Sequence, residues 1–534
     1  MGPPPFAIRN PQSEEGDGPM HVRNGRHFIL LMAMALWAGA PAQAAVKLHG
    51  LFSEGAVLQQ KMDVPVWGTA KDGENITVEI HNQKATTTAR DGRWLVRLKP
   101  LPAGGPYQLI VRGENTVEVP NVLVGEVWVC SGQSNMEWPL SQTHNPEPHM
   151  ASSKDPQLRL YSVPRAAADQ PASEVNARWE EAGPDTVPRF SAVGYFFGRD
   201  LRQALKVPVG LIKSAVGGTP AEAWADRATL ESNPEFKSIL DGYAQALADY
   251  PKAMERHREA LEKHKEAVAK ARQEGKQPPQ APRAPYGLES LTRPSGLYNA
   301  MIRPLQPYAI KGAIWYQGES NAGRAYQYRT LFPAMIANWR KAWGQGDFPF
   351  LFVQLAPFHK IDPEPKDSQW AELREAQLLT ARKVPAAGMA VITDVGEEDD
   401  IHPRKKEPVG ARLALAARGI AYGERIAHSG PVYEGMTVEK DRVALRFKQA
   451  GGGLVAQGGG PLKGFAVAGE DKKFVNAQAE IKGNTVVIHS PQVARPVAVR
   501  YGWANFPVVN LANKEGLLAS PFRTDDFPLT TKPK

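Results

Sequence analysis

The sequence predicts an α/β protein in which a parallel sheet with flanking helices is joined to an N-terminal and a C-terminal β-rich domain. Three observations support this fold class. Short strand-like segments separated by turns fill residues 45–121, strands alternate with helical stretches over 122–429, and β signals return over 430–534. Alternating strands and helices are typical of a parallel sheet, whereas closely spaced short strands favour a β-sandwich-like domain.

The composition is that of an ordinary folded protein. The chain has 534 residues, 42% of them hydrophobic and 22% charged, and a chain of this length usually holds about three domains. The net charge of +8 is spread along the sequence, which argues against a nucleic-acid partner. Cys130 is the only cysteine, so no intrachain disulfide can form and a cysteine-based zinc site is not expected. We predict that Cys130 itself is a buried strand residue.

Residues 1–44 are predicted to be a leader that ends in a secretory signal peptide. A basic segment from residue 20, an apolar run over 28–38 and the closing Ala42-Gln43-Ala44 have the order of such a signal. The apolar run is too short to cross about 30 Å of bilayer. We therefore expect cleavage after Ala44, a periplasmic or secreted protein, and no membrane association after cleavage.

The strands are expected where apolar residues alternate or form short runs between turn signals. In the first domain, 45–121, they are expected at 64–68, 76–80 and 107–111. In the central domain, 122–429, they are expected at 126–130, 209–216, 313–316, 350–355 and 389–394. In the last domain, 430–534, they are expected at 443–447, 485–488 and 497–501.

Residues 231–290 are predicted to be a helical insertion in the central domain. Apolar or aromatic side chains recur about every 3.5 residues, at Tyr243, Leu247, Tyr250, Met254, His257, Leu261, His264 and Val268. We interpret the two histidines as positions on a partly buried seam, because no carboxylate beside them completes a metal site. The Pro-rich segment 277–285 is an extended linker.

The first candidate for chemistry is the turn that follows the strand at 126–130. Its residues Gly132-Gln133-Ser134-Asn135 are expected at the carboxyl end of the sheet, where α/β enzymes keep their active sites. Ser134 is placed like a nucleophile, but a serine needs a base to remove its proton. The alternative is that Ser134 only caps a helix.

The second candidate is the acidic loop before His402. Its sequence is Glu397-Glu398-Asp399-Asp400-Ile401-His402, and a carboxylate beside an imidazole holds one tautomer and stabilises the imidazolium. Asp399 and Asp400 are the candidates for that carboxylate. A calcium-binding loop is the alternative, although the Asp-x-Asp-x-Asp-Gly spacing is absent.

Two further turns are expected at the same edge of the sheet. Gly217 and Gly218 follow one strand, and their backbone amides could approach an oxyanion closely. Gln317 and Asn321 follow another strand, and either could donate a side-chain hydrogen bond to an oxyanion. Further candidates for substrate contact or for support of the site are Gln133, Asn135, Gly217, Glu319 and Asn321.

Four of these segments resemble sequence blocks of the sialate O-acetylesterases in the SGNH hydrolase superfamily. They are Gly132-Gln133-Ser134-Asn135-Met136, Gly217-Gly218-Thr219, Trp315-Tyr316-Gln317-Gly318-Glu319-Ser320-Asn321 and Asp399-Asp400-Ile401-His402-Pro403. The resemblance implies an SGNH-hydrolase-like sheet, Ser134 as nucleophile and His402 as base. It also implies an oxyanion hole made by the amides of Ser134 and Gly218 with Gln317. The Asp-x-x-His spacing of the superfamily selects Asp399 to orient His402, with Asp400 or a backbone carbonyl as alternatives.

The function implied by this resemblance is hydrolysis of O-acetyl esters on carbohydrates through an acyl-enzyme, without a metal or cofactor. An acetyl xylan or other polysaccharide acetylesterase is the nearest alternative, and a non-catalytic carbohydrate-binding module is an alternative of another class. A pocket for sialate would offer a cation to the sugar carboxylate, for which Arg293, Arg303 and Arg324 are candidates. The acetylated sugar and the oligomeric state stay open at this stage.

Overall fold

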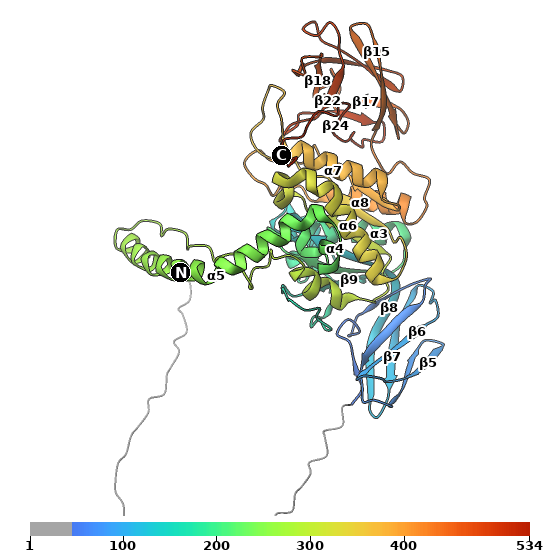
Figure 1. Cartoon of the computed structure of the whole chain (residues 1–534). Helices are drawn as coiled ribbons and strands as arrows, with labels where there is room; N and C mark the ends of the chain where they lie inside the picture. The colour runs from blue at the N-terminus through green and yellow to red at the C-terminus, as the bar shows by residue number, and fades with distance from the viewer. Residues whose placement is uncertain (1–44, 534) are drawn as a thin grey trace, which may run out of the picture. The chain divides into compact units, whose positions relative to one another are not determined.

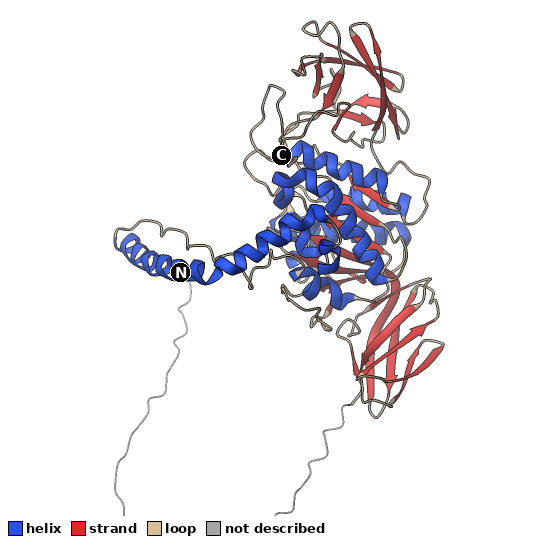
Figure 2. Ribbon diagram, viewed as in Figure 1, coloured by secondary structure: helices blue, strands red, loops and turns tan. Residues whose placement is uncertain are grey.

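A mostly parallel sheet forms the centre of the computed structural model, which describes residues 45–533 (Figures 1 and 2). The leader and signal peptide predicted for 1–44 lie outside the described residues. The strand order is β10-β9-β11-β8-β12-β13-β14, and the only antiparallel pair along this described path is β10 with β9. These strands are β8 (Thr116–Gly132), β9 (Asp155–Ser162), β10 (Trp179–Ala182), β11 (Val209–Ala215), β12 (Gly312–Tyr316), β13 (Phe350–Val353) and β14 (Ala387–Ala390).

Strand β8 is shared by two regions of the chain. Its first part pairs antiparallel with β7 (Gly104–Arg112), whereas its last part pairs in parallel with β11 and β12. The boundary predicted between residues 121 and 122 therefore falls inside one continuous strand. A buried run from Val122 onward keeps the strand extended, so that no linker separates the N-terminal β region from the central sheet.

Most strands of the N-terminal β region pair antiparallel, whereas β2 pairs in parallel with β8. One sheet has the order β1-β3-β6, and β4 pairs with β5 and with β7. In β4 and β6, buried and more exposed residues alternate, as expected for strands with one face in a core. The strands are β1 (Lys47–Leu48), β2 (Val57–Gln59), β3 (Val64–Thr69), β4 (Asn75–Ile80), β5 (Gln83–Thr88) and β6 (Arg93–Leu98).

Helices cover both faces of the central sheet. Successive side chains of its strands point to opposite faces, so each strand contributes side chains to two hydrophobic cores. In β12, Ala313 and Trp315 belong to the core under α6 and α7, whereas Ile314 and Tyr316 belong to the core under α3 and α8. Cys130 lies fully buried in the second core. The helices are α1 (Ser134–Glu137), α2 (Pro146–Ala151), α3 (Ala192–Leu205), α4 (Arg227–Glu231), α6 (Ala325–Trp343), α7 (Gln369–Lys383) and α8 (Glu407–Ile420).

Several short helical turns lie between the strands, and two of them, η3 and η7, carry residues discussed with the site below. They are η1 (Leu140–Gln142), η2 (Val187–Arg189), η3 (Ala221–Trp224), η4 (Pro234–Phe236), η5 (Tyr298–Ile302), η6 (Arg303–Leu305) and η7 (Glu319–Arg324). The last of these directly follows the carboxyl end of β12, so η7 reaches the edge of the sheet where Ser134 begins α1.

The insertion predicted at 231–290 contains the long helix α5 (Lys237–Gln273), which is 37 residues long (Figure 1). Only Ile239 and Ala271 of this helix are fully buried. The remaining seam positions, including His257 and His264, are half-buried. No regular secondary structure is formed from residue 276 to the end of the predicted insertion.

The C-terminal β region contains two four-stranded sheets and one two-stranded sheet. The sheet orders are β15-β16-β21-β20, β19-β18-β22-β24 and β17-β23. Their strands are β15 (Val432–Glu439), β16 (Arg442–Lys448), β17 (Leu454–Ala456), β18 (Phe465–Ala468), β19 (Val475–Asn476), β20 (Gln478–Lys482), β21 (Thr485–His489), β22 (Ala498–Tyr501), β23 (Leu511–Asn513) and β24 (Phe522–Arg523). Tyr433, Phe465, Tyr501 and Phe522 pack against one another in the core of this region.

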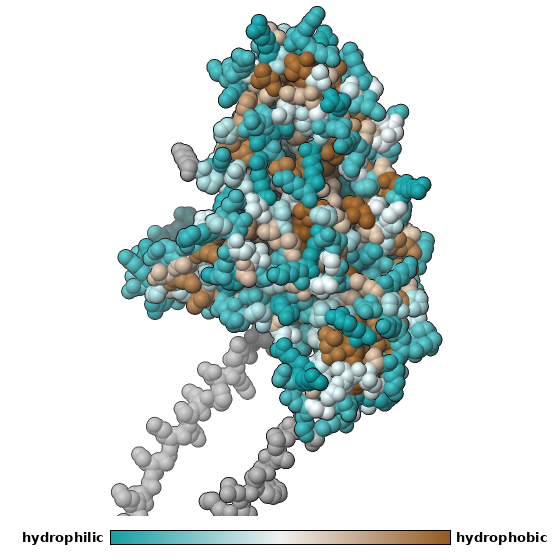
Figure 3. Space-filling view, turned by 45° about the vertical axis from the view of Figure 1, so that its right-hand side comes forward, coloured by the Kyte–Doolittle hydropathy of each residue, from teal (hydrophilic) through white to brown (hydrophobic). Residues whose placement is uncertain are grey.

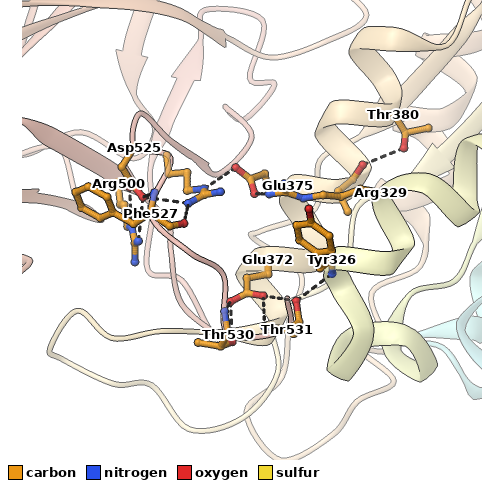
Figure 4. Close-up of polar contacts among 12 residues, drawn as sticks. Tyr326, Arg329, Glu372, Glu375, Thr380, Arg500, Asp525, Phe527, Thr530 and Thr531 are labelled. Carbon is orange, nitrogen blue, oxygen red and sulfur yellow. Dashed lines mark hydrogen bonds and ion pairs between the residues drawn. The ribbon is translucent and has the colours of Figure 1, made fainter. Parts of the chain in front are cut away.

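Polar contacts join the C-terminal segment to helices α6 and α7 (Figure 4). The carboxylate of Glu372 accepts hydrogen bonds from the backbone and hydroxyl groups of Thr530 and Thr531. Glu375, one turn further along α7, accepts a hydrogen bond of 2.8 Å from Arg523. The described residues 45–533 accordingly belong to one compact unit.

The visible surface is mainly hydrophilic, and hydrophobic side chains form small separate groups on it (Figure 3). Within residues 45–533, no helix combines the length and the apolar character that a membrane crossing requires. The large hydrophobic side chains that are exposed come from widely separated segments, namely Leu95, Tyr286, Leu288, Ile361, Val438, Val497 and Val508.

Candidate active site

The candidate nucleophile lies at a tight turn after β8. Gly132 has φ +136°, and a Cβ atom added there would lie 2.1 Å from the backbone oxygen of Tyr316 in the neighbouring strand. Only glycine therefore allows β8 and β12 to approach so closely at this point. The next residues form the short helix α1, which begins at Ser134 and places its side chain at the carboxyl edge of the sheet.

The structure brings Ser134 and His402 together although they are 268 residues apart in the chain. Ser134 Oγ lies 2.8 Å from His402 Nε2, which is hydrogen-bond distance. Trp138 stacks on the imidazole, with ring centres 5.0 Å apart and ring planes at 18°. A neutral imidazole held in this way can accept the proton of the serine hydroxyl.

The carboxylate beside His402 belongs to Asp400 and not to Asp399. Asp400 Oδ1 accepts a hydrogen bond of 2.8 Å from the His402 backbone amide and lies 3.5 Å from His402 Nδ1. The side chain of Asp399 is 80% exposed and pairs instead with Lys360 at 2.8 Å. The spacing rule that selected Asp399 does not hold here, because the loop turns the carboxylate two residues before His402 toward the ring.

Burial lowers the pKa of His402 below its usual 6.5, and the positive charge of Lys406 lowers it further. The charge and hydrogen-bonding capacity of Asp400 oppose these effects and raise the pKa. The Nδ1–Oδ1 separation of 3.5 Å is long for a hydrogen bond, so we attribute the influence of Asp400 mainly to its charge. The imidazole is consequently neutral, and able to act as a base, near neutral pH.

The acidic loop does not gather its carboxylates around a common centre. Glu397 accepts a hydrogen bond from the Arg404 amide and Glu398 accepts one from the Ile361 amide, while Asp399 and Asp400 face the partners described above. Residues 45–533 contain no group of three or more His, Cys, Asp or Glu side chains that could hold a metal ion. The contacts in the loop thus favour the catalytic interpretation over a calcium site.

Two backbone amides remain available for an oxyanion. Within the part of the chain that is described, no acceptor is hydrogen-bonded to the amide of Ser134 or of Gly218. Gly218 has φ +72° and lies in an exposed loop, and a Cβ added at the preceding Gly217 would be 3.3 Å from Ser134 Cβ. The Gly217 amide is already occupied, because it donates a hydrogen bond of 2.9 Å to Glu137. Gly218 is therefore the better donor of the two glycines.

The third predicted donor, Gln317, is committed to the protein interior. Its Nε2 donates to Asn321 Oδ1 at 2.6 Å and to the backbone oxygen of Thr219 at 3.3 Å, and its Oε1 accepts from Tyr328. Both amide hydrogens thus have acceptors, and the side chain is fully buried. Gln317 joins the turn after β12 to the turn after β11 and does not present a free donor, contrary to the oxyanion-hole role expected for it.

The remaining candidate residues connect the turns that carry the site. Gln133 Oε1 accepts weak hydrogen bonds of 3.4 Å from the amides of Gly318 and Ser320. Asn321 accepts from the Ala221 amide and donates to Glu222. These contacts place Gln133 and Asn321 in the support of the site.

Asn135 and Glu319 lie directly against each other. Asn135 Nδ2 donates to Glu319 Oε1 at 2.6 Å and to the backbone oxygen of Ile401 at 3.0 Å. Burial raises the pKa of Glu319, while hydrogen bonds from Asn135 and backbone amides and the charge of Lys406 oppose that shift. The Asn135 side chain thereby links three segments: the turn at 132–135 that carries Ser134 (the nucleophile turn), the turn after β12, and the loop at 397–402 that carries His402 (the histidine loop).

Three residues near the pair were not singled out by sequence reasoning as site residues. Glu137 binds the Gly217 amide, Trp138 stacks on His402, and Lys406 is buried beside Asn135. Two signals were present, since Glu137 and Trp138 follow Ser134 within one turn of chain and Lys406 stands four residues after His402. An acid at the end of α1 and an aromatic residue directly after it are ordinary, so the roles of Glu137 and Trp138 depend on their tertiary contacts.

Comparisons with known proteins agree with an esterase site. The family described as carbohydrate esterase, sialic acid-specific acetylesterase, matches residues 124–269 and 286–418. The sialate O-acetylesterase of Homo sapiens is 30% identical over 456 residues, which are 77% of this chain and 78% of that protein. The sialate O-acetylesterase of Mus musculus is 32% identical over 416 residues, which are 69% of this chain and 72% of that protein. A carbohydrate acetylesterase of known structure from Xanthomonas citri is 40% identical, covers 90% of this chain and all of its own, and gives a TM-score of 0.77.

Proposed function

This chain belongs to the sialic acid-specific acetylesterase family of carbohydrate esterases, and we propose that it uses Ser134 and His402 to remove acetyl groups from O-acetylated carbohydrates. As a member of that family it is a carboxylic ester hydrolase. The observation that carries the assignment of residues is the distance of 2.8 Å between Ser134 Oγ and His402 Nε2. A carbohydrate-binding module would have no use for such a pair.

The reaction proceeds through an acyl-enzyme. Ser134 Oγ bonds to the acetyl carbon while its proton passes to His402 Nε2, and the resulting oxyanion accepts hydrogen bonds from the amides of Ser134 and Gly218. The bond to the sugar oxygen then breaks, and that oxygen takes the proton from His402. Water, deprotonated by the same ring, attacks the acetyl carbon. The bond from that carbon to Ser134 Oγ then breaks, Ser134 Oγ takes the proton from His402, and acetate is released. Asp400 stabilises the imidazolium in both steps.

Replacement of Ser134 by alanine tests this mechanism. We expect Ser134→Ala to lower the rate of acetate release from a simple acetyl ester by about 10⁴-fold or more, because no other nucleophile can form the acyl-enzyme. The matched control is Ser141→Ala, which removes an exposed hydroxyl seven residues away and should leave the rate unchanged. A Ser134→Ala enzyme that keeps its activity would exclude Ser134 as the nucleophile.

We propose sialate as the acetylated sugar, with Arg165 as the residue that faces its carboxylate. The Arg165 side chain is 61% exposed, and its Nε donates to Glu137, whose other carboxylate oxygen binds the Gly217 amide beside Ser134. Among the earlier candidates, Arg293 is buried against Asp169 and Arg324 pairs with Glu222. Arg303 lines a cavity of about 840 Å³ that also includes Arg93 and Glu174 from other segments.

The similarity to an enzyme described only as a carbohydrate acetylesterase keeps a polysaccharide acetylesterase as the second candidate. Arg165→Ala distinguishes the two. For a sialate enzyme it should lower kcat/KM for O-acetylated sialic acid by about tenfold, the loss expected for one charge-assisted contact, and leave a neutral acetyl ester unaffected. An equal rate of acetate release from acetylated xylan in both proteins, with little release from acetylated sialic acid, would favour the polysaccharide enzyme.

Two wider expectations belong to the same proposal. The four sequence blocks follow the carboxyl ends of β8, β11, β12 and β14, an order that supports an SGNH hydrolase architecture for the central region. The basic, apolar and Ala-x-Ala segments of residues 1–44 support export and cleavage after Ala44. Determination of the N-terminal residue of the exported protein tests the second expectation.

A further inference from the structure

A buried lysine lies directly behind the Ser134–His402 pair. The side chain of Lys406, which is 1% exposed, donates from Nζ to Asn135 Oδ1. The same Nζ lies 5.8 Å from the centre of the Trp138 ring and 5.5 Å from the centre of the Tyr316 ring. Both separations are within the range of cation–π attraction, so the ammonium is held by one amide oxygen and two aromatic rings.

The partners of Lys406 belong to two segments of the site, the one that follows Ser134 and the end of β12. Asn135 is the residue after Ser134, and its Nδ2 contacts Glu319 and the backbone oxygen of Ile401. Trp138 stacks on the imidazole of His402. Tyr316 is the last residue of β12, and its backbone oxygen accepts a hydrogen bond from the Gln133 amide just before Ser134. Because Lys406 itself stands four residues after His402, its ammonium ties the segment that carries His402 to the segment that carries Ser134.

We propose that Lys406 is a positioning residue for this esterase: from the segment that carries His402 it binds Asn135 and the ring of Trp138, and so holds the turn that carries Ser134 against the histidine loop. The inference rests on the mechanism proposed above. It assigns Lys406 no contact with the substrate, because the side chain is enclosed by protein.

The charges around the two groups support this role. Burial has the largest effect on the pKa of Lys406 and lowers it to about 7. The carboxylates of Glu319, Asp400 and Glu397 face the ammonium and act in the opposite direction. His402 faces Lys406, which lowers its pKa, and Asp400, which raises it. The charge of Lys406 thus disfavours the protonated form of His402 in the resting enzyme. The charge of Asp400 partly offsets this effect when His402 takes the proton of Ser134.

The test is the pH profile of kcat/KM for a neutral acetyl ester. Lys406→Met keeps the length and apolar stem of the side chain but removes the charge. We expect the acid limb of the profile to move up by about half a pH unit, since a unit charge at close range no longer opposes the imidazolium. We also expect kcat to fall by about tenfold, because the serine and the imidazole are less well aligned.

Two variants serve as controls. Lys405→Met makes the same substitution at the neighbouring exposed position and should leave the limb and kcat unchanged. Lys406→Arg retains a cation and should restore the position of the limb. An acid limb that does not move in Lys406→Met, or that moves equally in Lys405→Met, would overturn the proposal, because a purely structural lysine would change kcat or stability but not the titration of His402.

Removal of one buried charge can prevent folding, so a second variant keeps the proposal testable. The double variant Glu319→Gln with Lys406→Met leaves two uncharged partners for Asn135. Glu319 is not among the groups that shift the pKa of His402, so the same upward movement of the acid limb is expected. Failure of the mechanism itself is recognised separately, since Ser134→Ala would then retain activity whatever the lysine variants do.

Discussion

Two clusters of buried charge in this protein differ in how completely their polar atoms are paired. On helix α7, Arg374 is fully buried and donates to the backbone oxygens of Leu355, Ala356, Ala504 and Asn505. Beside Ser134 and His402, Glu319 Oε2 is buried without a hydrogen-bond partner among the described residues, and the nearby Lys406 has a pKa of about 7.

The difference in pairing matches a difference in role. Burial lowers the pKa of Arg374 to about 9, so this guanidinium stays charged at neutral pH and joins α7 to the C-terminal β region. Incompletely paired groups with shifted pKa values gather at functional sites, because a proton can be moved there at low cost. We therefore expect the α7 cluster to serve stability, whereas the cluster of Lys406 and Glu319 fits the positioning role proposed for Lys406.

The largest effect is expected on activity, from removal of the base that lies next to the cluster of Lys406 and Glu319. His402→Ala should lower kcat/KM by about 10⁴-fold, equivalent to about 5 kcal/mol in the barrier, because Ser134 loses its proton acceptor. The melting temperature should change little, since the His402 side chain is 27% exposed. Acetate release and thermal unfolding measure the two quantities. Loss of less than tenfold in kcat/KM would contradict the role of His402.

The next effect concerns stability. Arg374→Met should lower the free energy of unfolding by about 3 kcal/mol or more, because four buried carbonyl groups lose their donor, while kcat of the folded enzyme should stay the same. Urea unfolding provides the measurement. The control is Arg382→Met on the same helix, where an exposed guanidinium donates to a single backbone oxygen. Equal losses in the two variants would remove the contrast between the clusters.

A smaller effect separates the two candidate carboxylates. Asp400→Asn should lower kcat by about 10- to 100-fold, since the imidazolium loses its negative neighbour. Asp399→Asn should change kcat by less than about twofold, because an exposed pair with Lys360 contributes little. Steady-state kinetics at one pH compares them directly, and a greater loss in Asp399→Asn would restore the spacing rule of the superfamily.

The smallest effect is in the pH dependence of the unmodified enzyme. The base must be deprotonated to act, and burial and Lys406 lower the pKa of His402. Activity should therefore rise with pH around a midpoint below 6.5, the usual value for histidine, and stay high through neutral pH. The acid limb of kcat/KM reports this midpoint, and a limb above 6.5 would mean that Asp400 outweighs both opposing influences.

Local patterns predicted several strands, such as β4 and β12, and placed Ser134 and His402 in turns at one edge of the sheet. The strand expected over 389–394 ends at Ala390, because Val391 and Ile392 are buried without pairing to a neighbouring strand, and strands such as β9 and β10 were not predicted. A buried strand that runs into a small polar turn has few other interpretations, which is why the turn at Ser134 and the loop at His402 could be placed at one edge of a sheet. The boundary expected between residues 121 and 122 falls inside strand β8, since sequence shows where a strand's residues are buried but not which neighbours the strand pairs with along its length.

The sequence by itself determined the class of fold, the family and the chemical types at the site: a serine, a histidine, acids and glycine amides. Only the tertiary structure decided which acid faces the ring, that Gln317 has no free donor and that Lys406 lies behind the pair. The reason is physical. Asn135 and Lys406 are 271 residues apart, and the direction of a side chain depends on partners brought to it by packing, which no local pattern records.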